Sequence, residues 1–189
     1  IAQRAASFGF VTIAFDVNNT FLDFPTSRSQ QLLAALDFVT STAKERTLVD
    51  PAREAVVGHS MGGGATLEAS RERPALKAAV GLAPWNPQIA FEDVSVPSLE
   101  IGAQNDFIAP VKDNARFFYD SLPNSTPKAY TEFSGLGHLG TNSASARVGA
   151  ATVAWLKRYV DEDTRYTPFI CGAHTAINAN ELSAYASNC

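Results

Sequence analysis

The segment Gly58-His59-Ser60-Met61-Gly62 has the residue types of a turn that exposes a nucleophilic hydroxyl group. It lies between an apolar run at residues 54–58 and a helical stretch at residues 61–73, and this strand–turn–helix position is typical of a nucleophile elbow. We expect a Cβ atom at position 58 or 62 to collide with the neighbouring backbone. The alternative is a glycine-rich connection that cradles phosphate, but the segment lacks the lysine of a phosphate loop. The motif therefore predicts Ser60 as a nucleophile.

A serine hydroxyl is a weak nucleophile and needs a neighbouring base. The chain has three histidines. His138 lies in a glycine-rich loop that follows a predicted strand, where a base is expected. His59 adjoins Ser60 and cannot easily turn back to meet it, and His174 lies in the C-terminal tail. We therefore predict His138 as the base.

The base needs an acid to orient it, and the chain order Ser, Asp, His places that acid between residues 60 and 138. Asp106 follows the predicted strand at residues 98–102, so it is the predicted acid. Three other aspartates compete. Asp93 precedes this strand, and Asp113 and Asp120 fall on the helix that follows it, with solvated faces expected.

Short apolar runs alternate with helical stretches along the chain. Strands are predicted at residues 10–15, 54–58, 78–82, 98–102 and 128–133, and helices at residues 29–43, 61–73, 110–122 and 143–160. This alternation predicts an α/β fold with a mostly parallel sheet and helices on both faces. The length of 189 residues fits a single domain over residues 1–189.

Composition excludes several classes of protein. Apolar residues make up 46% of the chain and charged residues 18%, which rules out a disordered chain. The net charge of −4, with no basic block, argues against a nucleic-acid partner. No apolar run is long enough to predict a membrane span. The only two cysteines, Cys171 and Cys189, favour a disulfide and an oxidising compartment over a metal site, and the alternative is two free thiols.

Motifs along nearly the whole chain resemble those of the bacterial cutinase-like polyester hydrolases, which include poly(ethylene terephthalate) hydrolases. The resemblance rests on Phe15-Asp16 with Asn18 and Thr20, Ser27-Arg28, the turn at Ser60 with Gly63 and Gly64, Ala83-Pro84-Trp85, residues 106–111, Gly137-His138, Asn142 and residues 161–166. The spacing of Cys171 and Cys189 also fits a C-terminal disulfide of this family.

The resemblance implies an α/β-hydrolase fold, secretion, no organic cofactor, and the hydrolysis of short-chain esters and polyesters in an open groove. Ser60, Asp106 and His138 would be the catalytic triad, and the backbone N–H of Met61 would donate to the oxyanion. Substrate-binding residues would be Trp85 as an aromatic wall, Ile108 opposite it, and Leu139 and Asn142 nearby. Two alternatives stay open: a lipase or thioesterase on the same fold, and a non-catalytic binding module.

The chain also departs from the family pattern. Gln104 and Ser134 replace the carboxylates of a calcium site, so no strong calcium binding is expected there. The first strands and a second oxyanion donor would precede residue 1, so we expect roughly 60–80 additional N-terminal residues in the functional protein. Without them, a sheet gap between residues 10–15 and 54–58 is expected to drive self-association.

Overall fold

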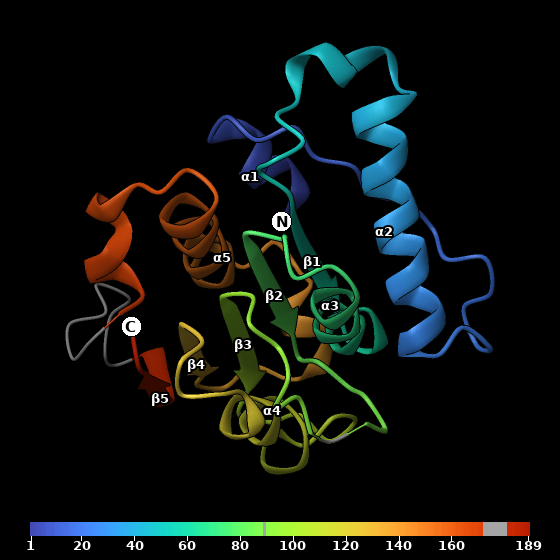
Figure 1. Cartoon of the computed structure of the whole chain (residues 1–189). Coiled ribbons are helices and arrows are strands. Elements are labelled where there is room, and N and C mark those ends of the chain that lie inside the picture. Colours follow the sequence, from blue (N-terminus) through green and yellow to red (C-terminus); the bar gives the residue numbers. More distant parts are fainter. Residues whose placement is uncertain (89, 172–180) are drawn as a thin grey trace.

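A five-stranded sheet forms the centre of the molecule in the computed structural model, which describes residues 1–88, 90–171 and 181–189 (Figure 1). Its strands are β1 (Ala55–His59), β2 (Ala78–Leu82), β3 (Ser98–Ala103), β4 (Lys128–Phe133) and β5 (Leu182–Ser187). They lie side by side in chain order. The first four strands are parallel, and β5 runs antiparallel to β4. The carboxyl ends of β1 to β4 therefore meet at one edge of the sheet.

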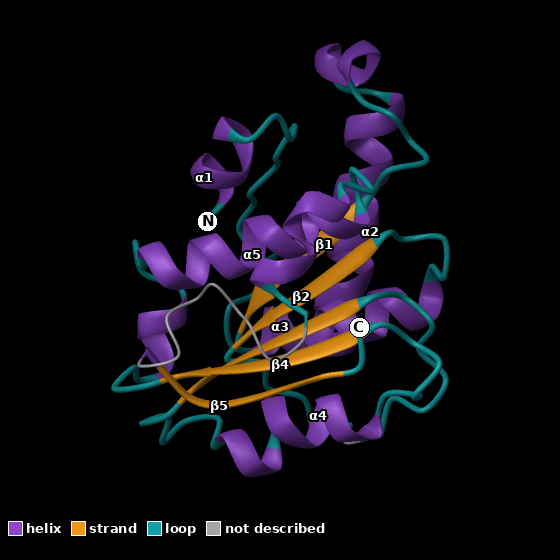
Figure 2. Ribbon diagram, turned by 90° about the vertical axis from the view of Figure 1, so that its left-hand side faces the viewer, coloured by secondary structure: helices purple, strands orange, loops and turns teal. Residues whose placement is uncertain are grey.

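Helices cover both faces of this sheet. They are α1 (Ala2–Ser7), α2 (Pro25–Ser41), α3 (Met61–Glu72), α4 (Ala115–Ser121) and α5 (Ala146–Tyr159), with 3-10 turns η1 (Lys44–Leu48), η2 (Val111–Asp113), η3 (His138–Thr141) and η4 (Thr164–Phe169). Figure 2 shows α5 and α4 on opposite sides of the strands. α1 shares the face of α5, and α3 shares the face of α4, with α2 packed outside α3.

Apolar burial explains why the central strands form where they do. Every residue of β2 and β3 is buried, which matches the continuous apolar runs expected of parallel strands that are covered on both faces. Val80 and Leu99 pack against Trp155 of α5 on one face, and Ala79 packs with Phe118 of α4 on the other. The predicted α/β architecture, with a mostly parallel sheet between helices, is confirmed.

The prediction of a strand at residues 10–15 is wrong. This segment lacks strand structure, and within the described part of the chain β1 pairs only with β2. A strand needs an adjacent backbone to satisfy its N–H and C=O groups. Here a cavity of about 670 Å³, lined by residues 10–15 and 53–59 among others, separates the segment from β1. Val11, Ile13 and Phe15 are 49%, 40% and 39% exposed as a result.

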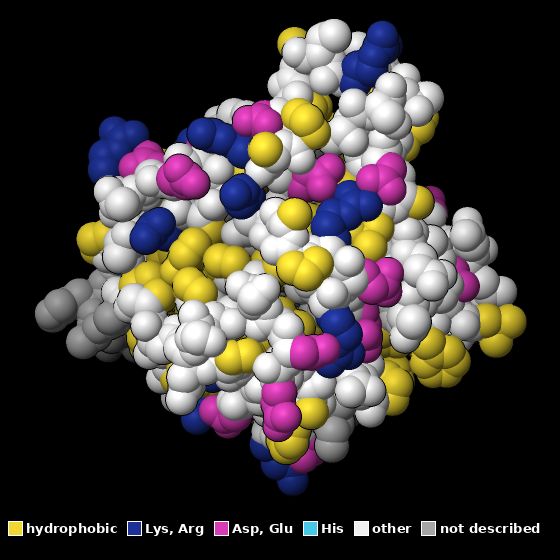
Figure 3. All heavy atoms as spheres, viewed as in Figure 1, with side chains coloured by type: hydrophobic (Ala, Val, Ile, Leu, Met, Phe, Trp, Pro, Cys, Tyr) yellow, Lys and Arg dark blue, Asp and Glu magenta, His cyan; other side chains and the backbone are white. Residues whose placement is uncertain are grey.

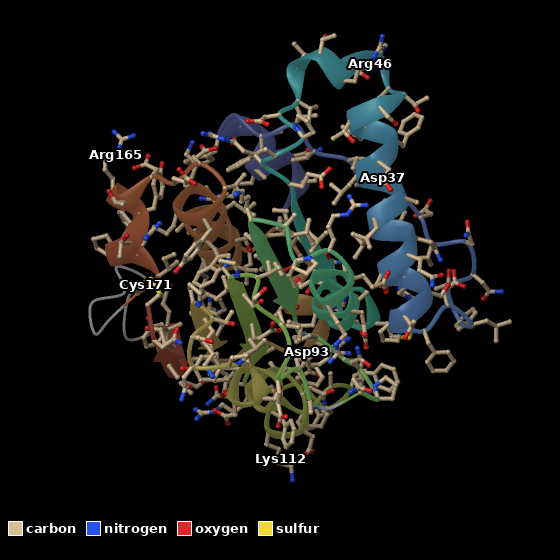
Figure 4. All side chains as sticks on the ribbon, viewed as in Figure 1. Asp37, Arg46, Asp93, Lys112, Arg165 and Cys171 are labelled. Atoms are coloured by element: carbon tan, nitrogen blue, oxygen red, sulfur yellow. A yellow bond between two sulfur atoms is a disulfide. The ribbon has the colours of Figure 1, made fainter. Side chains whose placement is uncertain are left out.

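Strand β5 was not among the predicted strands, and a disulfide lies at its C-terminal end. Cys171 and Cys189 are bonded with their Cα atoms 5.2 Å apart, so the predicted disulfide is confirmed. Figure 4 labels Cys171, which lies close to the C-terminal end of the chain. The bond closes the segment that returns as β5 along β4, and Tyr185 Oη on this strand donates to the carbonyl oxygen of Ile170 at 2.8 Å.

Charged side chains of both signs are interspersed on the face drawn in Figure 3. Among the helices of the described residues, none has the length and apolar character needed to cross a bilayer.

Glu100, in the middle of β3, is a charged residue type at a core position. Its side chain is fully buried, and neither carboxyl oxygen has a hydrogen-bond partner among the described residues. The opposite strand carries Gly81, where a Cβ atom would lie 2.4 Å from Glu100 Oε2, so the absence of a side chain at 81 makes the room. Burial raises the pKa of Glu100 from 4.5 to about 8.

This raised pKa predicts a pH-dependent loss of stability. Above pH 4.5 the unfolded chain releases the proton that the folded chain retains, so the free energy of unfolding falls as pH rises toward 8. Glu100→Gln removes this titration. We expect the difference in melting temperature, variant minus wild type, to increase steadily between pH 5 and pH 8, as measured by calorimetry.

The exposed Glu92→Gln variant is the matched control and should show a difference that does not change with pH. A Glu100→Gln effect of equal size at every pH would contradict the buried, protonated carboxyl.

Candidate active site

Each parallel strand delivers one predicted site residue to the same edge of the sheet. Ser60 directly follows β1, Trp85 follows β2, Asp106 follows β3 and His138 follows β4. Ligand and catalytic groups of open α/β sheets gather at this edge because the carboxyl ends of parallel strands point the same way. The fold thus brings together residues that are far apart in the sequence.

The three predicted triad side chains form one hydrogen-bonded chain. Ser60 Oγ lies 2.9 Å from His138 Nε2, and His138 Nδ1 lies 2.7 Å from Asp106 Oδ2. A carboxylate accepts hydrogen bonds, so the imidazole carries its proton on Nδ1 and leaves Nε2 free to accept the serine proton. This is the arrangement that a serine nucleophile requires.

The backbone at Ser60 is strained. Its φ of 56° and ψ of −122° lie in a region that residues with a side chain rarely adopt. Hydrogen bonds at both of its peptide groups hold this conformation, since its N–H donates to Leu82 at 3.0 Å and its C=O accepts from Trp85 at 2.9 Å. Such strain costs about 1–3 kcal/mol and is characteristic of functional sites.

Gly58 permits this turn, but Gly62 does not have the role we predicted for it. A Cβ atom at position 58 would lie 2.0 Å from the carbonyl oxygen of Gly62, so only glycine fits there. The expected collision at position 62 is wrong, because nothing lies within 4 Å of a Cβ atom built there. The start of α3 faces open space at 62.

Close packing of α3 instead depends on the next two glycines. A Cβ atom at Gly63 would lie 2.9 Å from Pro84 Cα, and one at Gly64 would lie 2.2 Å from the carbonyl oxygen of Trp85. The helix therefore begins directly against the loop that carries Trp85. Met61 is its first residue, and the first N–H groups of a helix have no acceptor within the helix.

Asp106 is held in a fixed orientation by its own loop. The side chain is buried, and Oδ1 accepts hydrogen bonds from the backbone N–H groups of Ile108 at 2.9 Å and Ala109 at 2.8 Å. Oδ2 is left to face His138. Because Oδ1 binds the backbone and Oδ2 binds His138, the carboxylate orients the imidazole while its hydrogen bonds to the backbone N–H groups stay in place.

The competing aspartates lie in ion pairs on the surface. Asp93, labelled in Figure 4, pairs with Arg71 at 2.7 Å. Asp120 pairs with Arg116 at 2.8 Å, and Asp113 lies 4.0 Å from Lys112. His174, the histidine that we assigned to the tail, lies outside the described residues.

His59 contributes to the site in a way that sequence reasoning missed. Its ring lies 4.7 Å from the ring of His138, and its Nε2 lies 3.0 Å from the backbone oxygen of His138. That oxygen also accepts from Thr141 Oγ1 at 3.0 Å. Burial lowers the pKa of His59, which favours the neutral ring, and the carbonyl oxygen beside Nε2 requires the proton of that ring to be on Nε2. His59 thus fixes the loop of the base rather than contacting the serine hydroxyl.

Backbone hydrogen bonds join the loop of the base to the loop of the acid. The N–H of Asn105 donates to Leu136 at 2.8 Å, and the N–H of Gln104 donates to Phe133 at 3.1 Å. Gln104 Oε1 accepts from the N–H of Gly135 at 2.9 Å, so this side chain also holds the two loops together. Nowhere in residues 1–88, 90–171 and 181–189 do three carboxylate, imidazole or thiolate groups gather as a metal would require.

The predicted substrate-binding residues surround this edge of the sheet. Trp85 is half-buried, whereas Ile108 and Leu139 are exposed next to Asp106 and His138 in the chain. Asn142 is exposed and lines the large cavity beside β1 together with His59 and Gly62. The first three therefore flank the triad loops, while Asn142 lies toward the cavity.

Comparison with known proteins agrees with this geometry. A family model described as PET hydrolase-like matches residues 1–189. A cutinase of Thermobifida alba is 48% identical over 192 residues, which cover 100% of this chain and 64% of the relative. A bis(hydroxyethyl) terephthalate hydrolase of Streptomyces coelicolor is 47% identical over 171 residues, which cover 90% of this chain and 55% of the relative.

A second cutinase, from Thermobifida cellulosilytica, is 48% identical over 191 residues and is covered to 72% of its length. The chain thus spans somewhat more than half to about three quarters of these relatives. The family match covers all of residues 1–189, and the three relatives are 47–48% identical to the chain. The chain belongs to the PET hydrolase-like family.

Proposed function

We propose that this protein is a serine ester hydrolase that cleaves short-chain acyl esters and polyesters through an acyl-enzyme intermediate. One observation carries the proposal: the hydrogen-bonded chain from Ser60 Oγ through His138 to Asp106, with distances of 2.9 and 2.7 Å. The strained turn that presents the serine supports it. The printed names of the relatives, cutinase and bis(hydroxyethyl) terephthalate hydrolase, support esters as the substrates.

In the acylation step, Ser60 Oγ attacks the ester carbonyl carbon while His138 Nε2 takes the serine proton. The imidazolium that forms is stabilised by the carboxylate of Asp106, which faces Nδ1. His138 then gives the proton to the leaving alcohol as the ester bond breaks. In deacylation, His138 takes a proton from water as the water oxygen attacks the acyl carbon, and it returns that proton to Ser60 Oγ as the acyl–Oγ bond breaks and the carboxylic acid leaves.

The backbone N–H of Met61 would donate to the oxyanion of the tetrahedral intermediate. It follows the nucleophile directly and begins α3, so the positive end of the helix dipole favours negative charge at this point. Trp85 would be the wall of the acyl site, with Ile108 opposite, and Leu139 and Asn142 would contact the substrate nearby. Exposure of the last three residues suits a groove that is open to a polymer chain.

We also propose that the protein is secreted. A disulfide such as Cys171–Cys189 persists in an oxidising environment and is rare in reducing compartments. A secreted enzyme also meets insoluble polyesters, which do not enter cells.

The acyl-enzyme gives the sharpest test of the ester hydrolase. When the protein turns over p-nitrophenyl butyrate and is quenched with acid, mass spectrometry should find a butyryl group on the peptide that contains Ser60. Ser60→Ala should abolish both turnover and the adduct, whereas Ser143→Ala, at an exposed serine, should change neither. Absence of turnover and of the adduct in the wild type would instead support a non-catalytic binding module.

We further propose that residues 1–189 on their own self-associate through the outer edge of β1. In the described part of the chain this edge has no strand partner, and apolar side chains line the cavity next to it. Unpaired strand edges recruit other strands. Light scattering should detect dimers or larger species whose fraction rises with protein concentration. A monomer over the whole concentration range would overturn this proposal.

A further inference from the structure

The loop that leads into α2 turns large apolar side chains toward solvent. We call residues 18–24 the aromatic loop. Phe21 is 86% exposed, Leu22 is 72% exposed and Phe24 is 53% exposed. Figure 3 shows hydrophobic side chains on the surface at the lower right, beside the N-terminal end of α2 (Figure 1). Folding alone does not account for them, because side chains that remain in water contribute little burial energy.

Polar side chains hold the backbone of the aromatic loop rigid. The carboxylate of Asp23 accepts from the N–H of Asn19 at 2.7 Å and from Gln31 Nε2 at 2.9 Å. Arg28 donates to the carbonyl oxygen of Asp23 at 2.6 Å and to that of Thr20 at 2.8 Å. The hydrogen bonds from Gln31 and Asn19 lower the pKa of the Asp23 carboxyl and keep it ionised. The exposed rings are therefore presented in fixed positions, which reduces the entropy lost on binding.

The aromatic loop is continuous with the candidate active site through two rings. The ring centroids of Phe24 and Trp85 lie 6.4 Å apart at an interplanar angle of 42°. The backbone N–H of Trp85 in turn donates to the carbonyl oxygen of Ser60 at 2.9 Å. Contacts thus lead from the nucleophile over Trp85 to Phe24, and the exposed side chains of Phe21 and Leu22 belong to the same loop as Phe24.

We propose that Phe24 is a specificity-determining residue that, next to Trp85, binds an aromatic ring of a polyester chain one unit away from the ester bond being cleaved. The inference rests on the proposed ester hydrolase activity. The ligand of this surface is an uncharged chain with aromatic rings, because Phe24 and Trp85 present aromatic rings and Leu22 an apolar side chain. Aromatic pairs favour offset or tilted contacts between rings. Phe21 and Leu22 extend the contact along the polymer. A short acyl ester is too small to reach from Ser60 past Trp85 to Phe24.

Kinetics with two esters tests the proposal. The substrates are p-nitrophenyl butyrate and bis(2-benzoyloxyethyl) terephthalate, a three-ring model of an aromatic polyester. Phe24→Ala should raise KM for the three-ring ester about fivefold more than KM for the butyrate, because one aromatic contact is lost. Phe24→Trp should restore the preference. Phe38→Ala is the matched control, since Phe38 is also an exposed ring, 50% exposed, farther along α2.

Equal losses on both esters with Phe24→Ala would mean that Phe24 only supports the fold of the loop, and no loss on either would mean that it binds nothing. Both results would overturn the proposal. Asp23→Ala should lower the preference for the three-ring ester as well, because it releases the loop that positions Phe24.

Binding without catalysis separates this proposal from the proposed activity. In a Ser60→Ala background, Phe24→Ala should weaken adsorption to an aromatic polyester film, and this holds even if the wild type hydrolyses neither ester. Vesicles of neutral phosphatidylcholine provide the competing surface. If Phe24→Ala weakens binding to vesicles and leaves adsorption to the film unchanged, the loop binds lipid and the proposal is wrong.

Discussion

The turn through Ser60 holds the nucleophile in a backbone conformation that side chains disfavour, and the surrounding structure is arranged to keep it there. The N–H of Ser60 donates to Leu82 at the end of β2 and its C=O accepts from Trp85 in the loop that follows, so both of its peptide groups are fixed. Gly58 lets the turn close against Gly62, and Gly63 and Gly64 let α3 approach Pro84 and Trp85. If the turn relaxed, the hydroxyl group would leave the reach of His138. The other loops, although aligned by the parallel strands, would then no longer face a nucleophile.

The register of the sheet converts chain order into spatial order. Because β1 to β4 are parallel neighbours, the residues after their carboxyl ends line up as Ser60, Trp85, Asp106 and His138. The histidine must still reach back from β4 to the serine after β1. Its loop does so along the loop of Asp106, and His59 and Thr141 hold its backbone oxygen. The side chain adjacent to the nucleophile thus stabilises the position of the base.

The residues that sequence reasoning placed correctly have strong local signals. A glycine-flanked serine between a strand and a helix, and an aspartate and a histidine in the loops that follow predicted strands, are recognisable without knowing their partners. Strand β2 occupies the predicted residues because it is buried on both faces and its sequence is an unbroken apolar run, and β4 also occupies its predicted residues although it carries Lys128 and Glu132.

The features that were missed depend on contacts far apart in the chain. Residues 10–15 have the composition of a strand, but strand structure needs a neighbour, and composition does not supply one. β5 is only partly buried and pairs with a strand some fifty residues away, so its own sequence gave a weak signal. Phe24 precedes α3 in the sequence and Trp85 follows it, so their contact joins two loops that are far apart in the chain. No local pattern predicts such a pair.

The central claim is that Asp106 orients His138 so that His138 can activate Ser60. The most direct measurement is the rate constant for labelling of Ser60 by a fluorophosphonate, compared between the wild type and Asp106→Asn. An amide at 106 can donate to Nδ1 and favour the wrong tautomer, so the rate constant should fall about a thousandfold or more. Asp113→Asn, at an exposed aspartate of the same loop region, should leave it unchanged. A rate constant for Asp106→Asn within tenfold of the wild type would contradict the account.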